Sequence, residues 1–213
     1  MALKLFIDND VMLKLARYGF LENLLELFTA QTEPVEVIVL DSARYKLLPR
    51  RNRHQLCGTE EVACQIECFL KKATVLSFDL VDTELVEILN ASPGIDAGEA
   101  LLFAGAARFE HARVLTGDKR ALDGLAAQGG PEVTESLGGK VIVMEALMQG
   151  FAKLDHNQVQ NAVRANPGVD KALTNIFGVS SPASLDSVHA GLESYKGLIR
   201  KTIGALINDG PPF

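Results

Sequence analysis

Five acidic side chains have the types and spacing best suited to chemistry, and most of them adjoin short apolar segments. They are Asp8, Asp10, Asp96, Glu99 and Asp118. Several carboxylates within a few ångströms of one another repel, which raises some of their pKa values unless a cation lies among them. Oxygen ligands of this kind suit Mg²⁺ or Mn²⁺, and such an ion polarises a phosphodiester and activates water as a nucleophile. The acids therefore predict a divalent metal site that acts on phosphate esters.

The same acids also have purely structural interpretations. The segment Asp96-Ala-Gly-Glu99 has the spacing of a capping box, with Asp at the helix N-cap and Glu three residues later. Asp118 and Asp10 are also placed to cap the helices expected after them. Asp8 closes an apolar run and has no evident capping partner of its own. The metal-site prediction therefore depends on the combination of acids and not on any single one.

The elements that position these acids alternate between short apolar strands and longer segments of helical periodicity. Near-continuous apolar runs that alternate with helices indicate a parallel sheet covered on both faces. We therefore expect a three-layer α/β/α domain over residues 1–150, with a central parallel sheet of four or five strands. Sites in such sheets form beyond the carboxyl ends of the strands, where these acids fall. The expected strands are 3–7, 35–40, 74–78, 111–116 and 140–144.

Residues 151–213 show helical segments without further strand signals. Helices are expected at 155–164, 170–177 and 184–207, separated by segments that contain Asn-Pro-Gly and Ser-Ser-Pro. This region is predicted to be a helical C-terminal extension, either a cap on the domain or a surface that binds a partner.

Composition limits the classes of protein that fit. The 213 residues are 47% hydrophobic and carry a formal net charge of −6, which argues against a disordered chain and against a protein that coats nucleic acid. No apolar run approaches the roughly 18 residues of a membrane-spanning helix, and acids interrupt the N-terminus early, so a cytoplasmic protein is expected. Three cysteines favour reduced thiols. Cys64 and Cys68 are four residues apart, but no familiar zinc spacing is present, and core packing is the expected role.

Basic residues gather in one short stretch despite the acidic total. Arg44, Lys46, Arg50, Arg51 and Arg53 fall within ten residues. Such a cluster is either a solvated face or a loop that contacts phosphate groups.

Three short motifs, in order, resemble the PIN-domain nucleases over roughly residues 3–145. They are Leu5-Phe6-Ile7-Asp8-Asn9-Asp10-Val11, then Ile95-Asp96-Ala97-Gly98-Glu99-Ala100, then Val114-Leu115-Thr116-Gly117-Asp118-Lys119-Arg120. The resemblance implies a Mg²⁺- or Mn²⁺-dependent ribonuclease, often the toxin of a toxin–antitoxin pair and commonly a homodimer. It implies that Asp8 and Asp118 are metal ligands, completed by Asp96, Glu99 or both, with Asp10 supporting the first acid.

The substrate path follows from the same resemblance. RNA is expected to pass the basic stretch from Arg44 to Arg53, with Lys119 and Arg120 as secondary contacts. The resemblance also implies an antitoxin protein as a partner. No association with a membrane is expected.

One position departs from the family pattern. The family usually places a further Glu on the helix after the second strand, but residues 42–48 contain no acid and carry Arg44 and Lys46. Three explanations stay open: Asp41 substitutes, the basic residues bind the substrate phosphate, or the site is degenerate and binds without cleavage.

A rival interpretation uses two of the same acids. Asp8-Asn9-Asp10-Val11 also resembles the opening of haloacid-dehalogenase-like phosphohydrolases, in which Asp8 is the nucleophile and Asp10 an acid–base group. The Gly117-Asp118 turn comes early for that family, and no convincing Ser/Thr strand and Lys lie between the motifs.

Overall fold

A parallel sheet forms the centre of the computed structural model, which describes residues 2–28, 34–51, 56–128 and 130–208. Within these residues the sheet has five strands in the order β3-β2-β1-β4-β5, and all of its pairings are parallel. The α/β class and the five-stranded parallel sheet are therefore confirmed. The strands are β1 (Leu3–Ile7), β2 (Val35–Val39), β3 (Thr74–Val75), β4 (Ala112–Thr116) and β5 (Val141–Val143).

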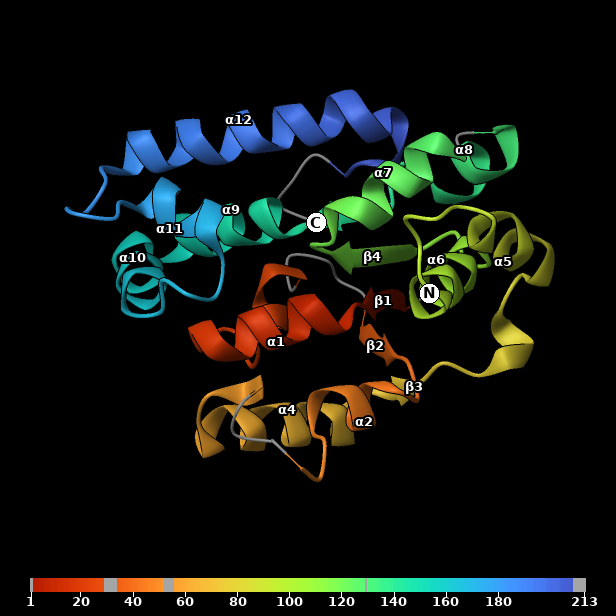
Figure 1. The fold of residues 1–213 in the computed structure, drawn as a ribbon, viewed down its shortest axis with the longest axis horizontal. Helices are drawn as coiled ribbons and strands as arrows, with labels where there is room; N and C mark the ends of the chain where they lie inside the picture. The colour runs from red at the N-terminus through yellow and green to blue at the C-terminus, as the bar shows by residue number, and fades with distance from the viewer. Residues whose placement is uncertain (1, 29–33, 52–55, 129, 209–213) are drawn as a thin grey trace.

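Helices lie on both sides of this sheet, which is compatible with three layers (Figure 1). α1 and α9 lie on one side, α5 and α6 lie on the other, and α12 runs along α7 and α9. The α-helices are α1 (Asn9–Tyr18), α2 (Ala43–Leu47), α4 (Glu60–Lys72), α5 (Thr83–Asn90), α6 (Ala97–Ala107), α7 (Lys119–Ala127), α8 (Pro131–Leu137), α9 (Met144–Leu154), α10 (His156–Ala165), α11 (Lys171–Phe177) and α12 (Leu185–Ile203). The described residues also form the short 3₁₀ helices η1 (Leu24–Phe28), η2 (Phe78–Leu80) and η3 (Gly204–Leu206).

Local chemistry explains where several elements begin and end. α1 stops at Gly19, whose left-handed backbone (φ 80°) lets its N–H donate to the carbonyls of Leu15 and Ala16. The expected strand 74–78 is only two residues long, because the chain turns into η2 after Ser77. α8 was not expected from the sequence, although Pro131 stands at its first turn, where proline is favoured.

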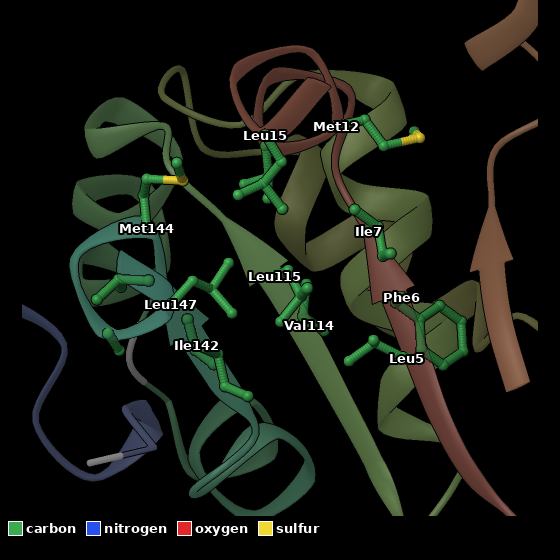
Figure 2. Close-up of a cluster of buried hydrophobic side chains, with 14 of the residues drawn as sticks. Leu5, Phe6, Ile7, Met12, Leu15, Val114, Leu115, Ile142, Met144 and Leu147 are labelled. Atoms are coloured by element: carbon green, nitrogen blue, oxygen red, sulfur yellow. The ribbon is translucent and has the colours of Figure 1, made fainter. Parts of the chain in front are cut away.

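The hydrophobic core joins strands and helices that are distant in sequence. Figure 2 shows side chains of β1, β4 and β5 packed beside those of α1 and α9, including Leu5, Leu115, Ile142, Leu15 and Leu147. Each of these five side chains is completely buried. The core therefore holds the adjacent strands β1 and β4 beneath the acidic side chains.

The C-terminal helices belong to the same core. Phe177 and Leu192 are fully buried members of the cluster that includes the sheet, and α9 runs through residue 150 without a break. Ile207 forms a parallel bridge with Val141 at the β5 edge, and the Asn208 N–H donates to the Val141 carbonyl at 2.7 Å. Within the described residues, no helix combines the length and apolar character that crossing a membrane requires.

Candidate functional site

Aspartates cap three of the helices that begin at the carboxyl end of the sheet. Asp8 precedes α1, Asp96 precedes α6 and Asp118 precedes α7. Parallel pairing of Ile7 with Leu115 places the ends of β1 and β4 side by side, and the Asp8 N–H donates to the Leu115 carbonyl at 3.0 Å. The topology therefore brings acids that are more than 100 residues apart to one edge of the sheet.

The capping interpretation is correct for Asp96, Glu99 and Asp118, and wrong for Asp10. Asp8 accepts a hydrogen bond from the Asn9 N–H at 2.7 Å and is the cap of α1. The expectation that Asp8 has no capping role is therefore wrong, and so is the expectation that Asp10 caps this helix. Asp96 and Glu99 form a complete capping box, with N···O distances of 2.8 and 2.7 Å. Asp118 accepts from the Arg120 N–H at 2.8 Å. Capping does not remove the charge of these groups, so a second role is compatible with it.

Electrostatic coupling joins the acids into one group. Burial first, and the charges of Asp10, Asp96 and Asp118 after it, raise the pKa of Asp8 to about 6 against the opposing hydrogen bond from Asn9. Burial likewise raises the pKa of Glu99 to about 7, with contributions from Asp96, Asp118 and Asp8. These two carboxyls are the ones that gain most from a cation placed among them.

Cationic side chains of the same chain already pair with the other three acids. Lys14 lies 2.8 Å from Asp10, Lys46 lies 3.7 Å from Asp96, and Arg120 lies 3.0 Å from Asp118. Partial burial acts to raise the pKa of Asp118, but the hydrogen bonds and charge of Arg120 outweigh it and hold that pKa below its ordinary value. Lys46 comes from α2, the helix on which the resemblance expects an acid.

The C-terminal extension reaches this edge through Lys14. The Lys14 ammonium lies 3.0 Å from the carboxylate of Asp170, the residue that caps α11. Asp10, the other partner of Lys14, packs against Gly117, where an added Cβ would lie 3.0 Å from the Asp10 carboxylate oxygen. Sequence reasoning did not identify Lys14 or Asp170. The i,i+4 spacing of Asp10 and Lys14 on α1 is a local signal that could have found Lys14, whereas the pairing of Lys14 with Asp170 leaves no local pattern.

The acids do not form a ready-made ligand set. Among the described residues, no three His, Cys, Asp or Glu side chains are arranged so that they hold a metal ion as they stand. The donor chemistry nevertheless fits Mg²⁺ or Mn²⁺, because Asp8 and Glu99 supply carboxylate oxygens whose ionised forms are destabilised by burial and by the charges of neighbouring acids. A bound ion would therefore be held first by these two groups.

The predicted RNA contacts lie at different places around the site. Arg44, Lys46, Arg50 and Arg51 are exposed, whereas Arg53 lies outside the described residues. Lys119 is also exposed, and its ammonium lies 5.2 Å from the ring centre of Tyr195 on α12.

The cysteine expectation is only partly correct. Cys57 is buried, as expected for a small apolar residue, but Cys64 and Cys68 are exposed on α4. Their spacing of four residues places them on the outer face of an amphipathic helix, whose inner face is formed by Ala63 and Ile66.

No protein-family model, no curated protein and no solved structure matches this chain.

The raised pKa of Asp8 predicts a pH-dependent gain in stability for Asp8→Asn. Asn caps helices as well as Asp does, so the substitution removes the charge and keeps the cap. A carboxyl whose pKa is higher in the folded protein stabilises it at low pH and loses that contribution as pH rises through about 6. We therefore expect Asp8→Asn to be more stable than the native protein by about 1–2 kcal/mol at pH 8 and to lose this advantage near pH 4. Urea denaturation at pH 8 and pH 4 measures the free energy of unfolding of both proteins. The same difference between variant and native protein at both pH values would contradict the prediction.

Proposed function

We propose that this protein is a PIN-like ribonuclease that requires Mg²⁺ or Mn²⁺. The observation that carries the proposal is the electrostatic coupling of Asp8, Glu99, Asp96 and Asp118 at the carboxyl ends of β1 and β4. Burial and neighbouring negative charges raise the pKa values of Asp8 and Glu99, and groups with shifted pKa values cluster at functional sites. The order of the three motifs, and their placement at one sheet edge, support the same conclusion.

Each residue at this edge has a distinct role in the proposed reaction. Asp8 and Glu99 hold the ion, and Asp118, Asp96 and Asp10 complete its surroundings. A divalent ion bound there supplies Lewis-acid polarisation of the phosphodiester and lowers the pKa of water. Lys46 and Arg120, at the margin of the acids, donate hydrogen bonds to phosphate oxygens of the RNA. The helix N-termini of α1, α6 and α7 add favourable dipoles for negative charge.

The phosphohydrolase alternative fits the geometry less well. It requires Asp10 to protonate a leaving group, but the Asp10 carboxylate is engaged by Lys14 at 2.8 Å, and Lys14 is itself fixed by Asp170. RNA cleavage that survives Asp10→Asn and is lost in Asp118→Asn supports the nuclease. A phosphoaspartate at Asp8, trapped with a fluoride analogue of phosphate, would instead support the phosphohydrolase.

A second candidate is a degenerate PIN-like module that binds RNA without cleaving it. Two observations favour it. Lys46 pairs with Asp96 from α2, the helix where the resemblance expects a further acid. Asp10, Asp96 and Asp118 also already have cationic partners. Such a module would bind RNA with no response to divalent ions. The antitoxin partner, homodimerisation and cytoplasmic location stay predictions of the sequence.

Thermal unfolding in Mn²⁺ tests the metal site directly. A ligand at a hundred times its dissociation constant stabilises a protein by about 2.7 kcal/mol, which for this size is a rise in Tm of about 5 °C or more. We expect that rise for the native protein and not for Asp118→Asn, which keeps the cap of α7 and loses a ligand charge. Asp186→Asn, on the exposed side of α12, is the matched control and should respond as the native protein does. The absence of any Mn²⁺ response in the native protein would refute the metal site.

A further inference from the structure

A groove of about 440 Å³ lies directly beside the acidic edge of the sheet. Its walls come from the end of β2, from α2, from the chain after β3 and from the first turn of α6, and they are mostly apolar. Lys46 lines the groove and also pairs with Asp96. Gly98 forms the boundary between groove and acids, since an added Cβ there would lie 3.0 Å from Leu40 and 3.1 Å from the Asp96 carboxylate. The groove is thus continuous with the proposed reaction site.

Exposed aromatic rings stand at this groove and at a smaller neighbour. Phe78 lines the groove and is 68% exposed. A second hollow of about 230 Å³ shares Leu40 and Asp41 with the groove and is lined by Tyr45, which is 73% exposed. Exposed aromatic side chains beside basic residues are the platforms on which unpaired bases stack. The size and apolar walls of the groove suit one planar ring system.

Asp41 supplies the polar selectivity of the groove. It lies between the two hollows, and within the described residues its carboxylate has no hydrogen-bond or ion-pair partner. A carboxylate only accepts hydrogen bonds. Guanine presents two adjacent N–H donors, at N1 and N2, which match the two carboxylate oxygens. Adenine and cytosine place a ring-nitrogen acceptor beside their amino group, and uracil flanks its single N–H with two carbonyls, so each of them sets an acceptor against Asp41.

We propose that this groove binds an unpaired guanine of the RNA, stacked on Phe78 and hydrogen-bonded by Asp41. The inference rests on the proposed ribonuclease function and adds a base preference to it. Lys46 then contacts the adjoining phosphate and directs the strand toward the acids. The guanine must be unpaired, because base pairing occupies the N1–H and N2–H donors that Asp41 needs.

Binding of short RNA without cleavage tests the groove separately from the reaction. Fluorescence anisotropy in EDTA compares labelled pentauridines that carry a central guanosine, inosine or adenosine. The guanosine strand should bind at least about fivefold more tightly than the adenosine strand, as a matched bidentate pair provides. Inosine lacks the N2 amino group and should lie between them.

Two variants with matched controls identify the residues responsible. In Asp41→Asn the dissociation constants of the guanosine and adenosine strands should lie within about twofold of each other, whereas Asp186→Asn should keep the preference for guanosine. Phe78→Ala should weaken binding of the guanosine strand by about fivefold or more, as the loss of one stacked base does. Leu154→Ala, at another exposed site, should leave this affinity unchanged. Both tested side chains are exposed, and circular dichroism checks that the fold is retained.

The outcomes separate this inference from the ribonuclease proposal. Equal binding of all strands, no binding at all, or an undiminished preference in Asp41→Asn would overturn the guanine groove. Each of these results leaves the Mn²⁺ stabilisation and the RNA cleavage assays intact as independent tests of the function. If cleavage and metal binding both fail, the ribonuclease proposal falls by its own measurements.

Discussion

Replacing Asp8 by Asn should reduce metal-dependent RNA cleavage by more than about 100-fold. Loss of a residue that only supports a metal ligand costs about 10- to 100-fold, so loss of a ligand should exceed that range. Asp8 is the most buried of the coupled acids, and its pKa of about 6 reflects that burial first and the neighbouring acids second. Asn keeps the hydrogen bond to the Asn9 N–H, so a folding defect does not explain the loss.

The measurement is a gel assay with labelled single-stranded RNA in Mg²⁺ or Mn²⁺, with EDTA as the blank. Asp123→Asn is the internal control, because this aspartate lies within α7 and outside the coupled group. Native activity in Asp8→Asn would remove Asp8 from the ligand set. Cleavage by the native protein in EDTA would remove the metal requirement itself.

Replacing Leu115 by Ala should lower the free energy of unfolding by about 2–5 kcal/mol. Leu115 is completely buried in β4, the strand between β1 and β5, where it packs within the cluster drawn in Figure 2. The lost methyl groups leave a cavity that the close-packed strands cannot collapse to fill. The same strand ends two residues before Asp118, so the substitution also loosens the sheet edge that carries the site.

Urea denaturation with a spectroscopic probe measures this loss, and Leu198→Ala is the comparison. Leu198 is 59% exposed on α12, and surface substitutions usually change stability by less than about 0.5 kcal/mol. Similar losses in the two variants would mean that the cluster around β4 is not the stabilising core.

The sequence predicts the strands well because their apolar runs are short and sharply bounded. Leu3–Ile7 is found as expected, and β2, β4 and β5 differ from their predicted ranges by one or two residues. β3 is overestimated, since the chain turns into η2 at Phe78, and the apolar side chains of Leu76 and Phe78 line the groove. An apolar side chain signals burial or a binding surface, and periodicity alone does not distinguish them.

The acids of the site are also predictable, whereas their partners are not. A carboxylate at the end of an apolar strand is visible in the chain, and the parallel topology then places Asp8 near Asp118. The ion pairs of Lys46 with Asp96 and of Lys14 with Asp170 join residues 50 to 156 positions apart. They depend on how α2 and α11 pack, which no local pattern encodes.

The bridge between Ile207 and Val141 has a consequence for how other molecules approach. An uncovered edge strand invites foreign strands to add to it, and natural proteins shorten or shield such edges. Here β5 is shielded by the returning chain, and β3 at the opposite border offers only two residues for pairing. Neither border suits β-augmentation, so association with a partner would have to use side-chain surfaces.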